Sequence, residues 1–238
     1  PKFLLSAQII PSIQVYLQTM QKVKDALPVY NICSLKGVDH LHDDIMAEPF
    51  SEYLKKHPNL HRPHGHSFYH LLLFTKGGGY HTIDFERFEV AVGQIYFMVP
   101  GQVHSWEFEG EMEGYVINFS DDLFHAFLSD QLYLERFNFL GGVTGENIIQ
   151  FNASERAEAE QLLSAVIVET QTIQPYSKDK VRLLMLSLFI LAARSESNNT
   201  GIGDTVKPNL QLLYKFRRLV NQHYSEYKLP KDYAAMLS

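Results

Sequence analysis

Cysteine and tryptophan are nearly absent from the 238-residue chain, which has one residue of each. The single cysteine, Cys33, excludes an internal disulfide and any zinc module built on several cysteines, and it suits a reducing compartment. At such an isolated position we expect a small buried hydrophobic side chain rather than a reactive thiol. The sequence therefore predicts a cytoplasmic protein that is stabilised by its hydrophobic core.

Long apolar runs and a surplus of basic residues are also missing. The longest apolar run, LLMLSLFILAA at 183–193, is well short of the roughly 20 residues that cross a bilayer, so no contact with a membrane is expected. The formal net charge is -6, which gives the chain as a whole no electrostatic attraction to nucleic acid. Any contact with DNA must then be local.

Short apolar and aromatic runs alternate with turn residues from about residue 64 to residue 120. The runs are FYHLLLFT, YHTIDF, FEVAVG, QIYFMV, VHSWEF and YVINFS, and GGG, PGQ and EGEMEG lie between some of them. Strands at this spacing predict an antiparallel sandwich or barrel. We expect the GGG at 77–79 to form a strand-to-strand turn where φ can be positive, because it lacks the Lys and Ser/Thr of a phosphate-binding loop.

Helices are expected after residue 150. Asn152 stands at an N-cap position and Glu155 follows three residues later, which is a variant of the capping box. The following residues repeat apolar side chains at helical spacing and predict one amphipathic helix. Its apolar stripe contains Ala159, Leu162, Leu163, Val166, Ile167 and Thr170.

The next helix, expected over 178–194, is apolar nearly all round and must be covered on two sides. One side can pack on the preceding helix. The other side needs a second partner, which is either the rest of the core or a second copy of the chain. For a homodimer we expect the outward face to contain Leu183, Leu186 and Ile190.

The C-terminal part of the chain changes character. Residues 195–208 are polar and rich in glycine and asparagine, which predicts a flexible linker. Residues 209–238 begin with a helical pattern and hold five basic residues against two acidic ones. Lys215, Arg217 and Arg218 are candidates for contacts with the DNA backbone. A solvated helix face carries the same charges, so both interpretations stand.

Four histidines fall within the ten residues HRPHGHSFYH, which end at His70. Alternate residues of a strand share a face, so His64, His66 and His70 are expected to point the same way and His61 is not. His104, in PGQVHSW, is a fourth candidate from a neighbouring strand. Converging imidazoles can bind zinc and related metals, or they can line a pocket for a small molecule.

Two regions of the sequence resemble one family. HGHSFYH, GGGYHTIDF, GQIYFMVPGQVHSW and GYVINFS resemble the cupin effector-binding domain of AraC-type (AraC/XylS family) transcription regulators over roughly residues 60–120. The tail FRRLVNQHYSEYKLPKDYAAMLS is similar to the opening of that family's helix-turn-helix domain. Their order and spacing agree with the family, which makes the two regions together more specific than either one.

The resemblance implies an α+β fold. An antiparallel cupin-like β-barrel (double-stranded β-helix) is followed by a helical dimerisation region and the first helices of a helix-turn-helix domain. The implied divisions are an N-terminal extension at 1–50, the barrel at 51–150, the dimerisation region at 151–194, the linker at 195–208 and a truncated DNA-binding domain at 209–238.

The resemblance also implies a function. It indicates a ligand-responsive transcription regulator that is not an enzyme, forms a homodimer and binds DNA through the full-length protein. The second helix of a helix-turn-helix motif carries the base contacts, and we expect it to begin beyond Ser238.

The alternative is a metal-dependent cupin enzyme such as a dioxygenase or isomerase. Cupin enzymes that resemble this barrel bind metal through histidines that match His64, His66 and His104, and His70 stands where they have a glutamate. Metal ligands would then be His64, His66, His70 and His104. Because that carboxylate is missing, the sequence favours no cofactor and a small effector of unspecified identity. Its candidate binding residues are His64, His66, His70, Tyr80, Tyr96, His104 and Trp106.

Overall fold

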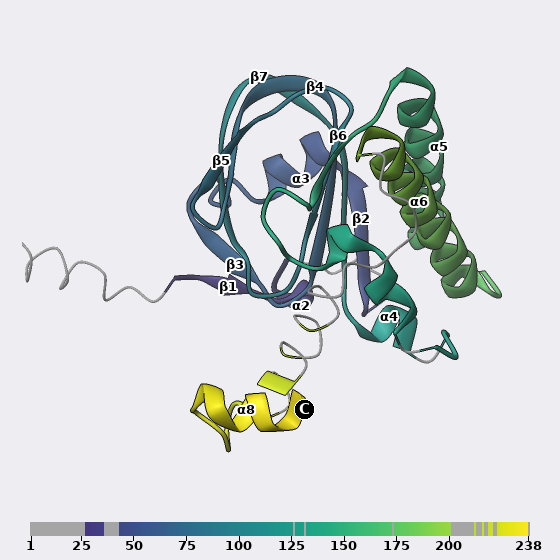
Figure 1. Cartoon of the computed structure of the whole chain (residues 1–238). Coiled ribbons are helices and arrows are strands. Elements are labelled where there is room, and N and C mark those ends of the chain that lie inside the picture. The colour runs from purple at the N-terminus through teal and green to yellow at the C-terminus, as the bar shows by residue number, and fades with distance from the viewer. Residues whose placement is uncertain are drawn as a thin grey trace, which may run out of the picture.

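The computed structural model describes residues 27–35, 43–125, 127–130, 132–172, 174–200, 212, 216, 219–220 and 223–237. Most of the β-strands come first in the sequence, and most of the helical residues follow them (Figure 1). Its strands are β1 (Val29–Tyr30), β2 (Ile45–Pro49), β3 (His64–His66), β4 (Tyr69–Ile83), β5 (Glu86–Glu89), β6 (Gln94–Met98), β7 (Val103–Phe119) and β8 (Ile148–Gln150). The helices are α2 (Ile32–Leu35), α3 (Phe50–Lys56), α4 (Asp122–His125), α5 (Ala153–Thr170), α6 (Ser177–Thr200) and α8 (Pro230–Leu237), and two short 3-10 turns lie at Tyr133–Arg136 and Asn138–Leu140.

The eight strands form one sheet that curves into a barrel (Figure 1). Neighbouring strands follow the order β1-β3-β7-β4-β6-β8, while β2 pairs with β7 and β5 pairs with β4. All of these pairs are antiparallel except β1 with β3. The predicted α+β class, with a largely antiparallel barrel followed by helices, is confirmed.

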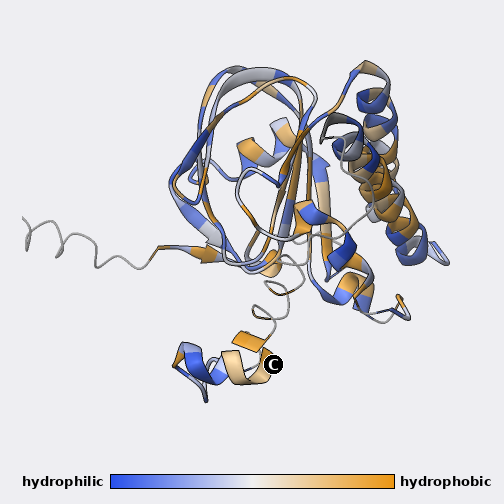
Figure 2. Cartoon of the chain, in the orientation of Figure 1, coloured by the Kyte–Doolittle hydropathy of each residue, from blue (hydrophilic) through white to orange (hydrophobic). Residues whose placement is uncertain are grey.

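The central strands carry apolar side chains on both faces, and each face packs into a different core. Along β4, Leu71 and Leu73 belong to an outer core between the sheet and helices α5 and α6. Leu72 and Phe74 point the other way, into an inner core that the barrel encloses together with α3. Figure 2 shows hydrophobic residues along the strands nearest α6 and along α6 itself. Both faces of these strands are therefore buried.

A one-residue change of register divides β4. Tyr69 pairs with Phe119, whereas beyond two irregularities between Phe74 and Gly78 the partner of Tyr80 is Glu107. A net shift of one residue exchanges the two faces of a strand, because side chains alternate with a period of two. Odd-numbered residues of β4 thus face the outer core before the shift and the barrel interior after it.

The GGG sequence lies inside β4 rather than at a turn, so the predicted turn at 77–79 is wrong. Gly77 and Gly79 do have positive φ values, of +105° and +103°. A Cβ atom on Gly79 would lie only 2.3 Å from the carbonyl oxygen of Glu107. These glycines therefore permit the bulged pairing of β4 with β7. The EGEMEG segment is likewise part of a continuous strand, since β7 runs through it.

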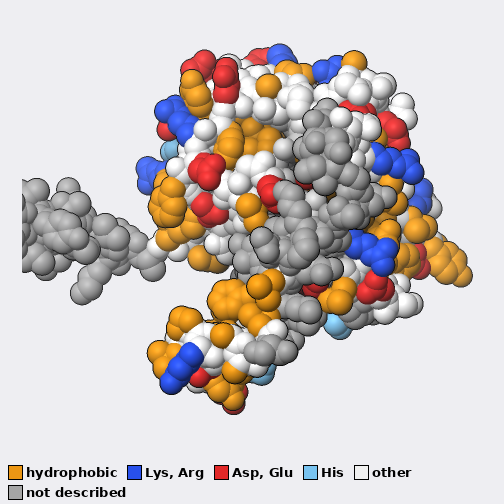
Figure 3. Space-filling model, viewed as in Figure 1, with side chains coloured by type: hydrophobic (Ala, Val, Ile, Leu, Met, Phe, Trp, Pro, Cys, Tyr) orange, Lys and Arg blue, Asp and Glu red, His pale blue; other side chains and the backbone are white. Residues whose placement is uncertain are grey.

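Charged side chains gather where β4 and β7 bend. Lys76 Nζ lies 2.8 Å from Glu111 Oε2 and 3.5 Å from Glu113 Oε1. The space-filling view shows acidic and basic side chains together along this upper rim of the barrel (Figure 3). Exposed ion pairs of this kind contribute little to stability, and they keep the outer surface of the bend polar.

Helix α5 begins as the sequence predicts. The Asn152 side chain accepts hydrogen bonds from the backbone N–H groups of Ser154 and Glu155, and the Glu155 carboxylate accepts one from the Asn152 N–H. Its buried residues include Ala159, Leu163, Val166, Ile167 and Thr170, while Leu162 is half-buried.

Helix α6 lies beside α5 and is longer than the sequence predicts (Figure 1). It continues through residues 195–200, which were expected to open the linker. Ser195 is buried, and its hydroxyl donates to Glu155 Oε2 at 3.0 Å. This contact with the start of α5 gives the polar end of α6 a partner inside the fold.

Two expectations about the N-terminal part are also corrected. Residues 45–49, which were assigned to an extension outside the barrel, form β2 and pair with β7, with Ile45 opposite Phe119. Cys33 is exposed rather than buried. The short helix α2 buries Ile32 and Leu35, which lie three residues apart on one side, and this leaves Cys33 on the other.

The C-terminal region contributes α8, which begins at Pro230, a residue favoured in the first turn of a helix. Lys215, Arg217 and Arg218 lie outside the described residues, as do linker residues 201–208. Among the described helices, none combines the length and the apolar character needed to cross a bilayer.

Candidate functional site

Five histidines meet in the inner core of the barrel. His64 and His66 come from β3, His70 and His81 from β4, and His104 from β7. Each side chain is at most 3% exposed. The structure thus brings together the four histidines that the sequence singles out, and it adds His81.

Strand pairing explains why the rings converge. In the register of β3 with β7, His64 lies opposite His104. In the register of β4 with β7, Ile83 is opposite His104 and His81 is opposite Trp106. β7 therefore lies between the two strands that supply its histidine neighbours. Because β3 ends at His66, His70 reaches the cluster from the next strand, not from a shared one.

His104 contacts two other imidazoles. Its Nε2 lies 2.7 Å from Nε2 of His66, and its Nδ1 lies 2.9 Å from Nε2 of His81. Each contact requires one nitrogen to donate its proton and the other to accept it. The tautomers of these three rings are consequently coupled.

The other two histidines, His64 and His70, have partners outside the row His66–His104–His81. His64 Nδ1 donates to the carbonyl oxygen of Arg62 at 2.7 Å, since a carbonyl can only accept. This fixes a tautomer whose Nε2 carries a free lone pair, and that buried atom has no hydrogen-bond partner in the described part of the chain. His70 Nδ1 lies 2.6 Å from the side-chain oxygen of Asn118.

Burial keeps the cluster uncharged. Burial lowers the pKa of His70 to about 3, which the hydrogen bond to Asn118 partly offsets, and burial lowers the pKa of His81 to about 3. The pKa values of His64, His66 and His104 are lowered for the same reason, and neighbouring histidines lower the last two further. All five rings are therefore neutral at pH 7 and can offer nitrogen lone pairs.

Aromatic rings enclose the cluster, but Tyr80 is not among them. The Trp106 ring centre lies 5.0 Å from that of His104, and the Tyr96 ring centre lies 4.9 Å from that of His81. Tyr80 is 37% exposed on the outside of β4, with the Arg87 guanidinium 3.8 Å above its ring. The register shift in β4 places it there.

Because of the same register shift in β4, the sequence pattern does not predict that His81 faces the barrel interior. Alternation from His70 assigns the barrel interior to even-numbered residues of β4, and this would turn His81 outward. The signal that could have found it is the glycine run, because glycines inside a strand pattern mark bulges. Asn118 was missed as well, since an isolated asparagine in a strand gives no distinctive pattern.

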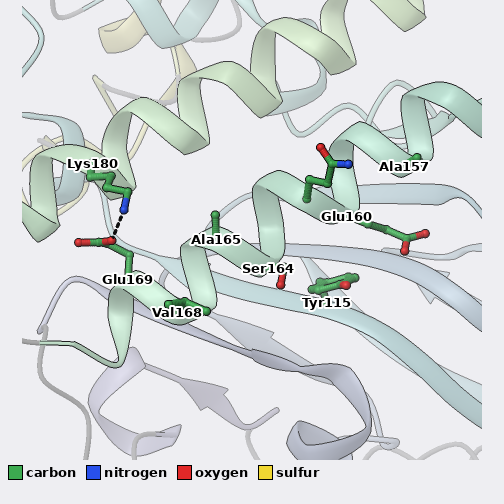
Figure 4. A pocket seen from close by; sticks show the side chains of 9 residues that line it. Tyr115, Ala157, Glu160, Ser164, Ala165, Val168, Glu169 and Lys180 are labelled. Carbon is green, nitrogen blue, oxygen red and sulfur yellow. Dashed lines mark ion pairs between the residues drawn. The ribbon is translucent and has the colours of Figure 1, made fainter.

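An open groove lies on the helical side of the sheet, away from the inner core (Figure 4). Lys180 of α6 forms an ion pair with Glu169 of α5 at 2.7 Å on one side of it. Tyr115 of β7 lies under Ser164 on the other side (Figure 4). The groove is lined by Tyr115, Ala157, Glu160, Gln161, Ser164, Ala165, Val168, Glu169 and Lys180.

The candidate dimerisation residues of α6 differ in exposure. Leu183 is 57% exposed and Ile190 is 36% exposed, while Leu186 is half-buried against the outer core. Val168 of α5 is also exposed, at 59%. The helical layer thus presents apolar side chains to solvent on its outer side.

The chain matches one family model and is similar to several solved structures. The family model described as "AraC-like ligand binding domain" matches residues 52–187. The chain is similar to the crystal structure of the AraC-like transcriptional activator CuxR, with 11% identity, a TM-score of 0.40, and coverage of 72% of this chain and 56% of that one. It is also similar to ToxT from Vibrio cholerae with a bound unsaturated fatty acid, with 10% identity, a TM-score of 0.45, and coverage of 82% and 69%. A search of curated proteins found no match.

Proposed function

This chain belongs to the family of AraC-like ligand binding domains, and from that premise we propose that it is the sensing part of a ligand-responsive transcription regulator. The observation that carries the proposal is the buried polar cluster. Polar groups are costly to bury, so five neutral imidazoles in an otherwise apolar and aromatic interior favour a ligand-binding role over a purely structural one. The protein acts in the cytoplasm and is not an enzyme.

The proposed effector is a small molecule held inside the barrel. Imidazole nitrogens supply hydrogen-bonding groups, and the aromatic rings supply apolar contact, which is the usual composition of a small-molecule site. The residues proposed to face the effector are His64, His66, His70, His81, His104, Tyr96 and Trp106.

DNA binding is proposed for the full-length protein. The tail from 209 to 238 is the basic part of an otherwise acidic chain, and Lys215, Arg217 and Arg218 would contact phosphates. Such contacts position a protein on the duplex, whereas base contacts give sequence specificity.

The experiment is a selection of fragmented genomic DNA on the full-length protein, followed by mobility-shift titrations of the recovered duplexes. We expect preferred binding to a few sequences over scrambled controls of the same length at 0.15 M salt. Binding that depends only on salt and shows no preference among sequences would contradict the proposal.

The homodimer is proposed to form through the outer face of α6. The exposed side chains of Leu183 and Ile190 lie seven residues apart, which is two helical turns, so they share one stripe. In sedimentation experiments, Leu183→Glu combined with Ile190→Glu should give a monomer. Phe85→Glu combined with Val92→Glu, at exposed apolar positions of the barrel, is the matched control for added charge. A wild-type protein that stays monomeric at high concentration would refute the dimer.

A further inference from the structure

We propose that the histidine cluster binds one divalent transition-metal ion through His64, His66 and His104, and that His81 positions His104 for this role. The sequence favoured no cofactor, because His70 stands in place of a carboxylate. The arrangement of the histidine nitrogen atoms favours a bound metal ion instead. The regulatory meaning of the ion rests on the proposed function, whereas its binding does not.

The three histidines lie close enough to share one metal ion. One ligand nitrogen from each lies within 4.8 Å of the others, and all three side chains are buried. Zinc-nitrogen bonds of about 2.0–2.1 Å place neighbouring ligand atoms roughly 3.0–3.4 Å apart. The 2.7 Å separation of the His66 and His104 Nε2 atoms therefore needs to open slightly, and the widest separation in the group, within 4.8 Å, needs to close when an ion binds.

His64 is oriented in advance. Its Nδ1–H donates to the Arg62 carbonyl at 2.7 Å, so the unpartnered Nε2 is the atom left to bind an ion. Histidine ligands of metals usually donate their second nitrogen in this way, and the partner fixes both tautomer and ring direction.

His81 does the same for His104. With a metal at Nε2 of His104, its Nδ1 carries the proton and donates to His81 Nε2 at 2.9 Å. His81 is then a positioning residue that does not itself touch the ion. His70 stays outside the ligand set, because among the described histidines only His64, His66 and His104 have ligand nitrogens that all lie within 4.8 Å of one another. Its Nδ1 contacts Asn118 and its ring stacks on His66.

The donor set selects the class of ion. In the described part of the chain this group consists of histidines alone, and imidazole suits zinc, copper, nickel and iron rather than the oxygen-preferring magnesium and calcium. Three neutral ligands leave the charge of a divalent ion uncompensated and leave coordination positions open. The site is therefore suited to an ion that carries an additional anionic ligand, such as a carboxylate.

The test uses untagged protein that has been stripped with a chelator. Zinc titration by calorimetry should give one ion per chain, and cobalt should give the visible absorption bands of a nitrogen-coordinated ion. His66→Gln and His104→Gln should lose this binding. His81→Gln should weaken it by about 10–100-fold without changing the stoichiometry. His61→Gln is the matched control, because this exposed histidine of the same stretch contacts Pro58 and should leave affinity unchanged.

Two results would overturn the proposal. One is a wild-type protein that binds neither zinc nor cobalt at one ion per chain, and the other is a folded His66→Gln variant with wild-type affinity. Circular dichroism checks the fold of each variant. If His66→Gln does not fold, a wild-type cobalt spectrum typical of oxygen ligands alone refutes the proposal. Metal binding is measured without DNA, so its failure and the failure of the proposed function are distinguishable.

Discussion

The two faces of the same strands contain different chemistry. On the outer face of β4, β6 and β7, apolar side chains pack against α5 and α6, and Phe189 of α6 contacts rings from both the sheet and the 3-10 segment. On the inner face, apolar and aromatic residues surround five neutral imidazoles. Both faces are buried to the same degree, so burial alone does not explain the difference.

The outer face stabilises the fold, whereas the inner face is suited to binding. Packing of the outer face gains free energy from every apolar contact. The inner face gives up part of that gain, because polar groups lose hydration and, as at His64 Nε2, some find no partner. Substitutions on each face, and acid, test this difference.

Truncation of the outer core should have the largest effect. Phe189 is fully buried, and its ring centre lies 5.6 Å from that of Phe137 and 6.0 Å from that of Phe119. Phe189→Ala should lower the free energy of unfolding by about 3–5 kcal/mol in urea titrations. Leu183→Ala on the exposed side of α6 should change it by less than about 0.5 kcal/mol. Equal effects of the two would show that α6 is not anchored by this face.

Acid should destabilise the metal-free protein through the inner face. The unfolded chain binds protons on histidine near pH 6.5, while burial holds the pKa values of His70 and His81 to about 3 in the folded state. The stability is therefore complete above pH 6.5 and falls as the pH decreases toward 3. These two rings together should remove up to about 3 kcal/mol between pH 6 and pH 5. Urea titrations at each pH measure this, and a flat profile over that range would contradict neutral burial.

The register shift can be tested at one glycine. Gly79→Ala places a Cβ atom against Glu107 at a φ of +103° and should cost about 1–3 kcal/mol. Gly78→Ala is the matched control, since no atom lies within 4 Å of its added Cβ. Thermal unfolding of the two variants compares them directly. A similar midpoint for both would mean that the bulge adapts without strain.

Replacement of the imidazole row should have the smallest effect on stability. His66→Leu, His81→Leu and His104→Leu together remove all members of the row His66–His104–His81, so none of the three is left without its partner. The free energy of unfolding should then stay within about 1.5 kcal/mol of the wild type, or rise. A loss of several kcal/mol in urea titrations of metal-free protein would give these residues a structural role.

The sequence predicted those features that depend on local patterns. The capped start of α5 follows from Asn152 and Glu155. The barrel follows from the succession of apolar and aromatic runs, although GGG and EGEMEG lie inside strands and not at turns. The positions of His81 and Tyr80 depend instead on a bulge that reverses the alternation within β4. The extension of α6 to Thr200 depends on the contact of Ser195 with α5. Such tertiary interactions are not visible in the periodicity of a single segment.

The pairing of β7 with its neighbours has a consequence for communication across the molecule. Asn118 contacts His70 in the barrel interior, and the next residue, Phe119, has its ring centre 6.0 Å from that of Phe189 in α6. Strand β7 alone thus separates the histidine cluster from the helical layer at this point. The peptide unit between Asn118 and Phe119 joins a side chain on its inner face to one on its outer face. In a close-packed interior, a displacement of that peptide moves both side chains together. A change at the histidines therefore has a path to the helices that requires no hinge.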